Sequence, residues 1–426
     1  TLQNQISEYE NSTIWKMTKP LRKLLDEAKR IKRKIYPELK ADYRELIKTR
    51  KQMQEQYAFP KNLLEEYSTK DCIEDYSVLI QFKNKLEAAG YQTNCPLYTA
   101  DPGSYYGIQN DMLSYAGIPP EKEKIKDYAL IEHGAHFQNI APFGGEGKRR
   151  YTGYITLGDF RKKFLQEKYR LPVYTVGPYI AYAEQYYDEE LLKKKKEEWG
   201  RTLLIFYAHN HEWLHKVYED NDFIRFIKEQ QSQFDTLALC CYWADLEEDY
   251  VHAFEEMGVK IVTSGFRSDC NFMRRQKSLL TLADAVLTND IGSHVGYSIY
   301  MNKPLTYYET KVTEQESRER LTDKAVWLIE KNKKEIAKCF LPKEGKLHEK
   351  ITLQQKEVCM FYFGLEYVST PEEMKAIFSL PREIYEKIEK HIGSYGKAAE
   401  TLRKMLKASK DEEGKTKGYI LDESLK

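Results

Sequence analysis

The sequence carries no excess of charge of either sign. Its 67 Lys and Arg residues against 66 Asp and Glu residues leave a formal net charge of +1. Proteins that bind nucleic acid normally carry a large basic excess, so nucleic acid is not an expected partner. The chain also has no run of about 18 or more apolar residues and no apolar signal-peptide core at its start. These absences favour a cytoplasmic chain.

Several motifs are missing as well. The seven cysteines form no CxxC pair and no framework spacing, which favours reduced thiols and a cytoplasmic location. The sequence contains no GxGxxG fingerprint, no GxxxxGK[ST] phosphate loop and no GxSxG nucleophile elbow. We therefore expect no bound cofactor and no structural metal.

The pattern that is present is a regular alternation of strand and helix. A chain of 426 residues with 41% hydrophobic and 31% charged residues suits two α/β domains with attachments. Alternation at this spacing predicts parallel βα units. We predict two doubly wound Rossmann-like domains, facing a cleft and joined by a short polar hinge at residues 192–200. The boundaries are a helical extension at 1–58, domains at 59–190 and 191–311, and a helical region at 312–426.

Expected elements follow from apolar periodicity and turn residues. In the first domain we predict strands at 127–131, 151–157 and 172–176, and helices at 76–90 and 158–168. In the second we predict strands at 201–208, 236–243, 260–263, 285–288 and 304–307, and helices at 222–233, 250–258, 272–282 and 295–301.

The N-terminal extension has apolar residues at helical spacing on one face and basic residues on the other. Two interpretations stay open: a linker helix packed against a further domain upstream of Thr1, or a peripheral contact with the inner face of the membrane.

The segment 285–304 carries the strongest signal. An apolar strand ends at Thr288, and a helix opens at Ser293 after Gly292. Free backbone N–H groups at a helix start attract phosphate, and the side chains of Ser293 and His294 could add donors. The alternative is a capped helix without a ligand, because Ser is a common N-cap.

A second cluster, Glu132-His133-Gly134-Ala135-His136, follows the predicted strand 127–131. A carboxylate and two imidazoles at a strand end have coupled protons, and one of them could act as a general base near neutral pH. Glu132 and His133 are both candidates, and His136 is a candidate substrate contact. The alternative is a purely structural role for both groups.

A third cluster, residues 208–215, follows the first strand of the second domain. Its residues His211 to His215 match HExxH, a zinc-protease pattern that requires a helix. Because the match follows a strand in a series of βα units, we expect no metal there. His209, Asn210 and His211 are instead candidate substrate contacts.

Two further candidates lie beside predicted strand ends. Gly265, Arg267 and Arg274 lie between a strand and its following helix, where the arginines could neutralise a diphosphate or a sugar carboxylate; Arg275 and Lys277 are typical of a solvated basic face. Tyr242 and Trp243 end the strand 236–243, where they could stack on a base or sugar or simply pack in the core.

On these residues the chain resembles the GT-B glycosyltransferases of bacterial capsule and lipopolysaccharide gene clusters. IEHGAHF, VGPYIAYAE and DIGSHVGYSIYMNKP carry the likeness over about residues 60 to 310, and STIWKMTKPLRKL resembles the helix that joins domains in multidomain polysaccharide enzymes. The resemblance implies a metal-independent transferase whose second domain holds a nucleotide-sugar donor. The phosphate-binding turn would fall on Asp290 to Val295, and the acceptor-side base on Glu132 or His133.

The expected reaction is transfer of a sugar to a glycan or lipid-linked acceptor during surface-polysaccharide synthesis. The Ser-His pair and the nearby arginines would suit a CMP-linked acidic sugar. Two alternatives stay open: a teichoic-acid-type polyol-phosphate transferase, and a non-catalytic module that binds glycan or docks another enzyme.

Overall fold

The computed structural model describes residues 66–67, 70–88, 102–119, 129–138, 153–169, 172–209, 214–219, 221–317 and 323–381. The predicted extension at 1–58 and the end of the chain beyond residue 381 lie outside these ranges. The described elements belong to one structural unit, which includes Phe59–Ser394.

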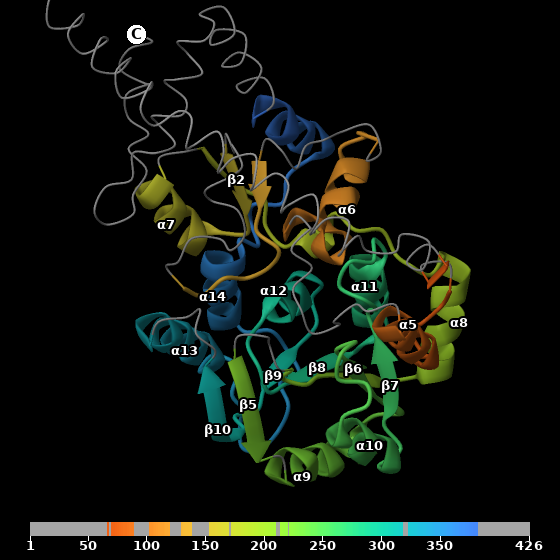
Figure 1. Ribbon diagram of the computed structural model, residues 1–426. Helices are drawn as coiled ribbons and strands as arrows, with labels where there is room; N and C mark the ends of the chain where they lie inside the picture. Colours follow the sequence, from red (N-terminus) through yellow and green to blue (C-terminus); the bar gives the residue numbers. More distant parts are fainter. Residues whose placement is uncertain are drawn as a thin grey trace, which may run out of the picture. The chain divides into compact units, whose positions relative to one another are not determined.

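A five-stranded parallel sheet forms the larger half of this unit (Figure 1). Its strand order is β7-β6-β4-β8-β9. The chain enters at β4, moves outward to β6 and β7, then crosses back to β8 and β9, which is the predicted doubly wound topology. The strands are β4 (Thr202–Phe206), β6 (Thr236–Cys241), β7 (Lys260–Thr263), β8 (Ala285–Thr288) and β9 (Leu305–Tyr307).

Alternation along these strands sends apolar side chains to both faces of the sheet. Leu203 and Ile205 pack with apolar residues of α5 (Ser77–Ala88), α9 (Asn221–Gln230) and α10 (Asp249–Glu256). Leu204 and Phe206 pack on the other side with α11 (Phe272–Leu282) and α12 (Ser293–Tyr300). Burial on both faces explains why these strands are continuous apolar runs. Helix α5 belongs to this core although it lies within the predicted first domain.

A smaller parallel sheet carries the other half, in the order β1-β2-β3 (Figure 1). Its strands are β1 (Ala129–Ile131), β2 (Gly153–Thr156) and β3 (Val173–Thr175), and α7 (Asp159–Tyr169) connects the last two. Over the described residues this sheet grows in one direction only, so the double winding predicted for the first domain is not seen there. Beside it lie the short helix η1 (Pro102–Gly107), α6 (Ile108–Tyr115) and η4 (Tyr179–Ala181).

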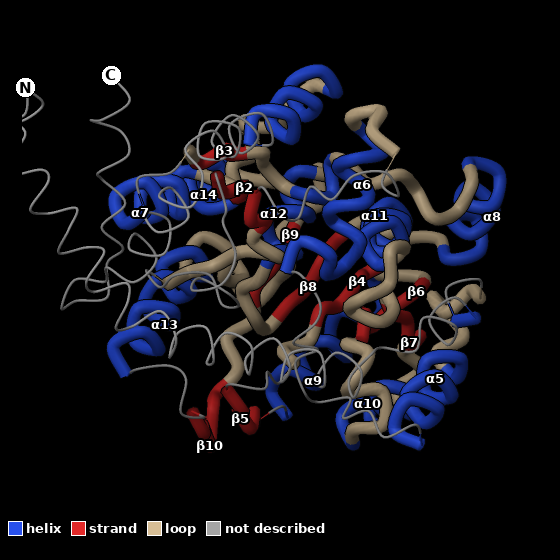
Figure 2. The backbone as a smooth tube through the Cα atoms, turned by 45° about the horizontal axis from the view of Figure 1, so that its top comes forward, coloured by secondary structure: helices blue, strands red, loops and turns tan. Residues whose placement is uncertain are grey.

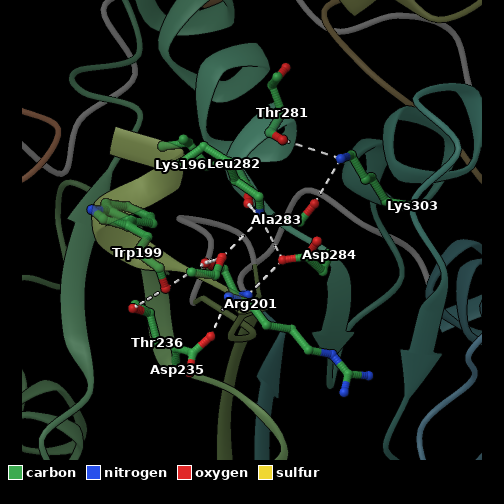
Figure 3. A network of polar contacts seen from close by, with 12 residues as sticks. Lys196, Trp199, Arg201, Asp235, Thr236, Thr281, Leu282, Ala283, Asp284 and Lys303 are labelled. Atoms are coloured by element: carbon green, nitrogen blue, oxygen red, sulfur yellow. Dashed lines mark hydrogen bonds and ion pairs between the residues drawn. The ribbon is translucent and has the colours of Figure 1, made fainter. Parts of the chain in front are cut away.

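The polar segment 192–200 was predicted to be a hinge. In the structure it contributes most of helix α8 (Glu189–Trp199). Trp199, at the end of the helix, is 1% exposed. Lys196 Nζ contacts the carbonyl oxygen of Leu282 at 2.8 Å, and Trp199 accepts a hydrogen bond from Thr236 Oγ1 at 2.7 Å (Figure 3). These contacts fasten α8 to the amino ends of the large sheet.

An antiparallel ribbon was missed in the sequence. β5 (Leu214–Glu219) pairs with β10 (Lys311–Ser317), and the register shifts between Val312 and Glu314. The prediction of a helical region from residue 312 is therefore wrong in part, although α13 (Asp323–Ala337) and α14 (Leu353–Phe363) confirm helices further on. HExxH now ends in a strand, which is not the helix that zinc ligation through this motif needs.

Helix α14 connects the two sheets. It lies between α7 and α12 (Figure 2) and contacts both. Thr352 begins it with a capping box, and Gly364 ends it in a left-handed conformation. Phe363, fully buried, packs where Gly296 of α12 leaves no side chain: a Cβ at Gly296 would lie 2.5 Å from the Phe363 ring. The core that surrounds α14 includes residues of both sheets.

Replacing Gly364 with alanine should destabilise this connection. Gly364 has φ +65°, and a Cβ there would lie 2.2 Å from the carbonyl oxygen of Leu157. We expect a loss of about 1–2 kcal/mol for the left-handed backbone and about 1–3 kcal/mol for the overlap. Gly345→Ala is the matched control, because Gly345 has φ +71° and open space around it. Equal shifts of the urea midpoint in both variants would contradict the packing argument.

Candidate functional site

The candidate site lies at the carboxyl ends of the large sheet, where the winding reverses between β4 and β8. Open α/β sheets bind ligands at such a switch point. His209 follows β4, Tyr242 follows β6, Arg267 follows β7, and the turn 289–293 follows β8. Because neighbouring strands of this sheet are parallel, these residues follow strand ends at one edge of the sheet.

The turn before α12 meets the loop that follows β1. Ser293 Oγ accepts a hydrogen bond from the amide of Ala135 at 2.9 Å. A Cβ at Gly134 would lie 2.9 Å from the same oxygen, so glycine permits this approach. Gly292 is the N-cap of α12, and no side chain caps the helix there. The start of α12 and the loop 133–136 therefore form one surface.

His294 is turned back into the protein. Its Nε2 lies 3.0 Å from Thr288 Oγ1, and its ring stacks on Phe206 with centroids 4.8 Å apart. Burial lowers the pKa of His294 to about 4, although Asp290 opposes the shift. The imidazole is therefore neutral at pH 7 and adds no charge for a phosphate. As a neutral ring it can donate one hydrogen bond, and its contacts with Thr288 and Phe206 fix its position in the turn.

Asp290 and His209 lie beside this turn. Lys333 of α13 reaches Asp290 with Nζ–Oδ1 at 2.7 Å. His209 stacks on Tyr242 with centroids 4.3 Å apart, and burial lowers its pKa to about 4 while Asp290 opposes the shift. Trp243, only 2% exposed, packs against Phe266. Of the two predicted aromatic contacts, Trp243 thus belongs to the core and Tyr242 remains at the site.

Glu132 is committed to a buried ion pair. Arg161 of α7 donates from Nε to both carboxylate oxygens at 3.1 Å and also contacts Glu132 through Nη2, and Thr156 Oγ1 donates at 2.6 Å. Burial alone would raise the pKa of Glu132, but Arg161 holds it below its usual value. This carboxylate is a weak base with its oxygens already bonded. Of the two candidate bases, His133 therefore fits the role better than Glu132 does.

His133 and His136 lie edge to face, with centroids 5.1 Å apart. Burial lowers the pKa of His133, Arg267 lowers it further, and Glu132 opposes both. Burial likewise lowers the pKa of His136 to about 3. Both imidazoles are free bases at pH 7, which is the form that accepts a proton.

The three predicted residues of this segment, Gly265, Arg267 and Arg274, have different surroundings in the structure. Arg267 lies over the Tyr105 ring, with Cζ 5.7 Å from the centroid. Arg274 pairs with Asp111 of α6 at 2.8 Å, so it supports the packing of α11. Gly265 has φ +100°, and a Cβ there would lie 2.6 Å from Arg275 Nη1.

Arg275 does not lie on a solvated face. It is fully buried and pairs with Asp269 at 2.5 Å. The interpretation of this position as a solvated basic residue is wrong, because the helix face that carries it packs inward. The buried ion pair between Arg275 and Asp269 therefore holds the loop 265–271 in place.

The η1 turn was not predicted, and it adds two tyrosines to the site. The Tyr105 ring is perpendicular to the His133 ring with centroids 5.5 Å apart. Tyr106 has φ +61°, which is uncommon for a residue with a Cβ, and its amide donates to the carbonyl oxygen of Arg267 at 2.6 Å. Strained backbone of this kind clusters at functional sites. The strain at Tyr106 is not visible in a sequence, but Pro102-Gly103 is a turn signal that could have indicated the η1 turn.

Asn210 and His211 lie outside the described residues, and so does most of the HExxH segment. Among the described residues no group of three or more His, Cys, Asp or Glu side chains could hold a metal ion. No helix in the same ranges is long and apolar enough to cross a membrane.

No protein-family profile matches the sequence, and no curated protein matches it either. Among solved structures, one similar chain is UGT2 of Phytolacca americana, complexed with UDP-2-fluoro-glucose and pterostilbene. The identity is 14% and the TM-score 0.23, and the match covers 60% of this chain and 52% of that one. The likeness is too slight to bear on function.

Proposed function

We propose that the chain is a glycosyltransferase that moves a sugar from a nucleotide-activated donor to an acceptor hydroxyl. The observation that carries the proposal is the meeting of two parallel sheets' loops at one switch point, through the bond from Ala135 to Ser293. One side offers an anion site and the other offers a neutral base, as group transfer between two substrates requires.

The donor would be held by the second sheet. The start of α12 presents backbone N–H groups with the positive end of the helix dipole, which suits a phosphate. Arg267 would supply a positive charge. Arg274 is paired with Asp111, so we do not assign it to the donor. A CMP-linked acidic sugar remains the donor that the sequence resemblance suggests. A metal-independent reaction fits this arrangement, since cationic and N–H groups take the place of a metal ion at the leaving phosphate.

The acceptor would approach from the first sheet. His133 is a free base at pH 7 because its pKa is lowered, so it can remove the proton of the attacking hydroxyl. The negative charge of Glu132, which Arg161 holds in place, would stabilise the imidazolium that forms. We extend the proposal to a glycan or lipid-linked acceptor in bacterial surface-polysaccharide synthesis on the cytoplasmic side. This part rests on the sequence resemblance described above.

The test is nucleotide binding by the full chain. CMP, UMP, UDP, GDP and dTDP are titrated while the unfolding temperature is followed. A nucleotide at about one hundred times its dissociation constant should stabilise the folded state by about 2.7 kcal/mol. If none of them raises the unfolding temperature at millimolar concentration, the proposal is wrong. Mass spectrometry of the product then distinguishes a glycoside from the phosphodiester of a polyol-phosphate transferase.

Arg267→Gln should weaken binding of the stabilising nucleotide by about tenfold to a hundredfold, because a hydrogen bond to a charged group contributes about 1.5–3 kcal/mol. Ser293→Ala should weaken it less, through the loss of the bond to Ala135. Arg201→Gln is the matched control, since Arg201 lies over Phe234 at the amino end of β4. Isothermal titration calorimetry checks all three. Unchanged affinity in Arg267→Gln would remove the anion site from the proposal.

A further inference from the structure

We propose that Tyr105 is a positioning residue that holds the Arg267 guanidinium beside the His133 imidazole, so that an anion bound at Arg267 is sensed at His133. The inference rests on the proposed function in one respect: it takes the anion to be the donor's phosphate. It adds a communication between the donor side and the acceptor side that neither sheet provides alone.

The geometry places Tyr105 between the two groups. Its ring meets the edge of His133 at an interplanar angle of 88° and carries the Arg267 guanidinium at 5.7 Å from its centroid. A guanidinium within about 6 Å of an aromatic ring is attracted by the ring's quadrupole. One aromatic ring therefore contacts the candidate base and the candidate anion-binding group.

The backbone of η1 holds this ring in place. The amide of Tyr106 donates to the carbonyl oxygen of Arg267 at 2.6 Å, and the Tyr106 ring packs on Phe272 with centroids 4.6 Å apart. A Cβ at Gly107 would lie 2.2 Å from the carbonyl oxygen of Cys270. The φ of +61° at Tyr106 is a strained conformation for a residue with a Cβ, and it persists because these contacts offset the strain.

The charges around His133 give the direction of the effect. The ionisable groups facing it are Glu132 and His136 from its own loop, Arg267 from the loop after β7, and the phenols of Tyr105 and Tyr106. Arg267 disfavours the imidazolium and Glu132 favours it. An anion that neutralises Arg267 removes the disfavouring charge and raises the pKa of His133. His133 therefore becomes a stronger base only when the donor is bound, and it is a weaker base in the empty site.

The experiment measures how fast diethyl pyrocarbonate modifies His133 as a function of pH, using the full chain. The reagent attacks neutral imidazole, and fragmentation of the modified peptide separates His133 from His136. The midpoint of the pH profile reports the charge environment, whereas the plateau at high pH reports access to the ring. A merely structural role of Tyr105 would move the plateau and leave the midpoint in place.

We expect Arg267→Gln to raise the midpoint by about one unit. Tyr105→Leu should also raise the midpoint. Tyr105→Phe keeps the ring and should give the same midpoint as the chain without substitutions. Arg201→Gln should leave it unchanged. An unmoved midpoint in Arg267→Gln overturns the inference, and so does an unmoved midpoint in Tyr105→Leu, because Tyr105 would then not position the guanidinium.

Adding CMP, or whichever nucleotide stabilises the chain, should raise the midpoint of the unmodified chain and have no effect on that of Arg267→Gln. A nucleotide that stabilises the chain without moving the midpoint refutes the coupling and leaves the proposed function standing. If no nucleotide stabilises the chain, the proposed function fails, and the comparison of Arg267→Gln with the unmodified chain still decides whether Arg267 acts on His133.

Discussion

Replacing Arg161 with alanine should lower the stability of the folded chain by about 3–5 kcal/mol, because the change leaves a buried carboxylate without its partner. Arg161 is 2% exposed and Glu132 is 1% exposed. Arg161 also contacts the carbonyl oxygen of Gln138 through Nη1, so the substitution removes a partner of this oxygen as well. The measurement is the urea midpoint followed by tyrosine and tryptophan fluorescence.

Arg225→Ala provides the matched control. Arg225 pairs with Asp222 at 2.6 Å, but both side chains are more than 60% exposed, and such pairs contribute about 0–1 kcal/mol. The double variant Glu132→Gln/Arg161→Met removes both charges and should recover part of the loss. If Arg161→Ala lost no more than Arg225→Ala, the ion pair would not fix the end of β1.

The ion pair also predicts a dependence on pH. The pKa of Glu132 in the folded chain lies below its unfolded value of about 4.3. Its contribution is therefore fully present above that unfolded value and is lost as the pH falls through the folded pKa. The difference between Arg161→Ala and the unmodified chain should accordingly shrink in acid.

The large sheet could be predicted because its local signals and its long-range packing agree. Strands buried on both faces are continuous apolar runs, so β7 and β8 begin and end at the predicted residues, and α11 does too. The ribbon of β5 and β10 could not be found in this way. Its strands are mostly polar, and each depends on a partner about a hundred residues away.

The site was predicted as a location better than as a set of roles. The rule that ligands bind at carboxyl strand ends brought His133, Arg267 and Ser293 to one place. Roles depend on partners far away in the sequence: Arg161, 29 residues after Glu132, makes that carboxylate structural, and Asp111 removes Arg274 from the donor side. Tyr105 lies beside a turn signal, Pro102-Gly103, but its contacts with His133 and Arg267 join residues far apart in the sequence and cannot be read from the turn alone.

His133→Gln should lower turnover by about a hundredfold to ten-thousandfold, the usual contribution of a general base. Glutamine keeps the size and polarity of the side chain but cannot accept the acceptor's proton at neutral pH. Because His133 is half-buried and neutral at pH 7, its replacement by neutral glutamine should leave stability and nucleotide affinity nearly unchanged. The effect should therefore lie in kcat and not in donor binding.

The assay is release of nucleotide from sugar donors that carry the nucleotide identified by the binding screen, with water or glycan as acceptor. In the unmodified chain kcat/KM should fall on the acid side as His133 becomes protonated, at a pH below the ordinary range for histidine because burial and Arg267 lower its pKa. That acid limb should disappear in His133→Gln. His252→Gln, at an exposed position on α10, is the matched control and should keep full turnover. Turnover within a few-fold of the unmodified chain in His133→Gln, with the acid limb intact, would show that another group removes the proton. Since Glu132 is held by Arg161, that group would be His136 or would come from outside the loop 132–136 or from the substrate itself.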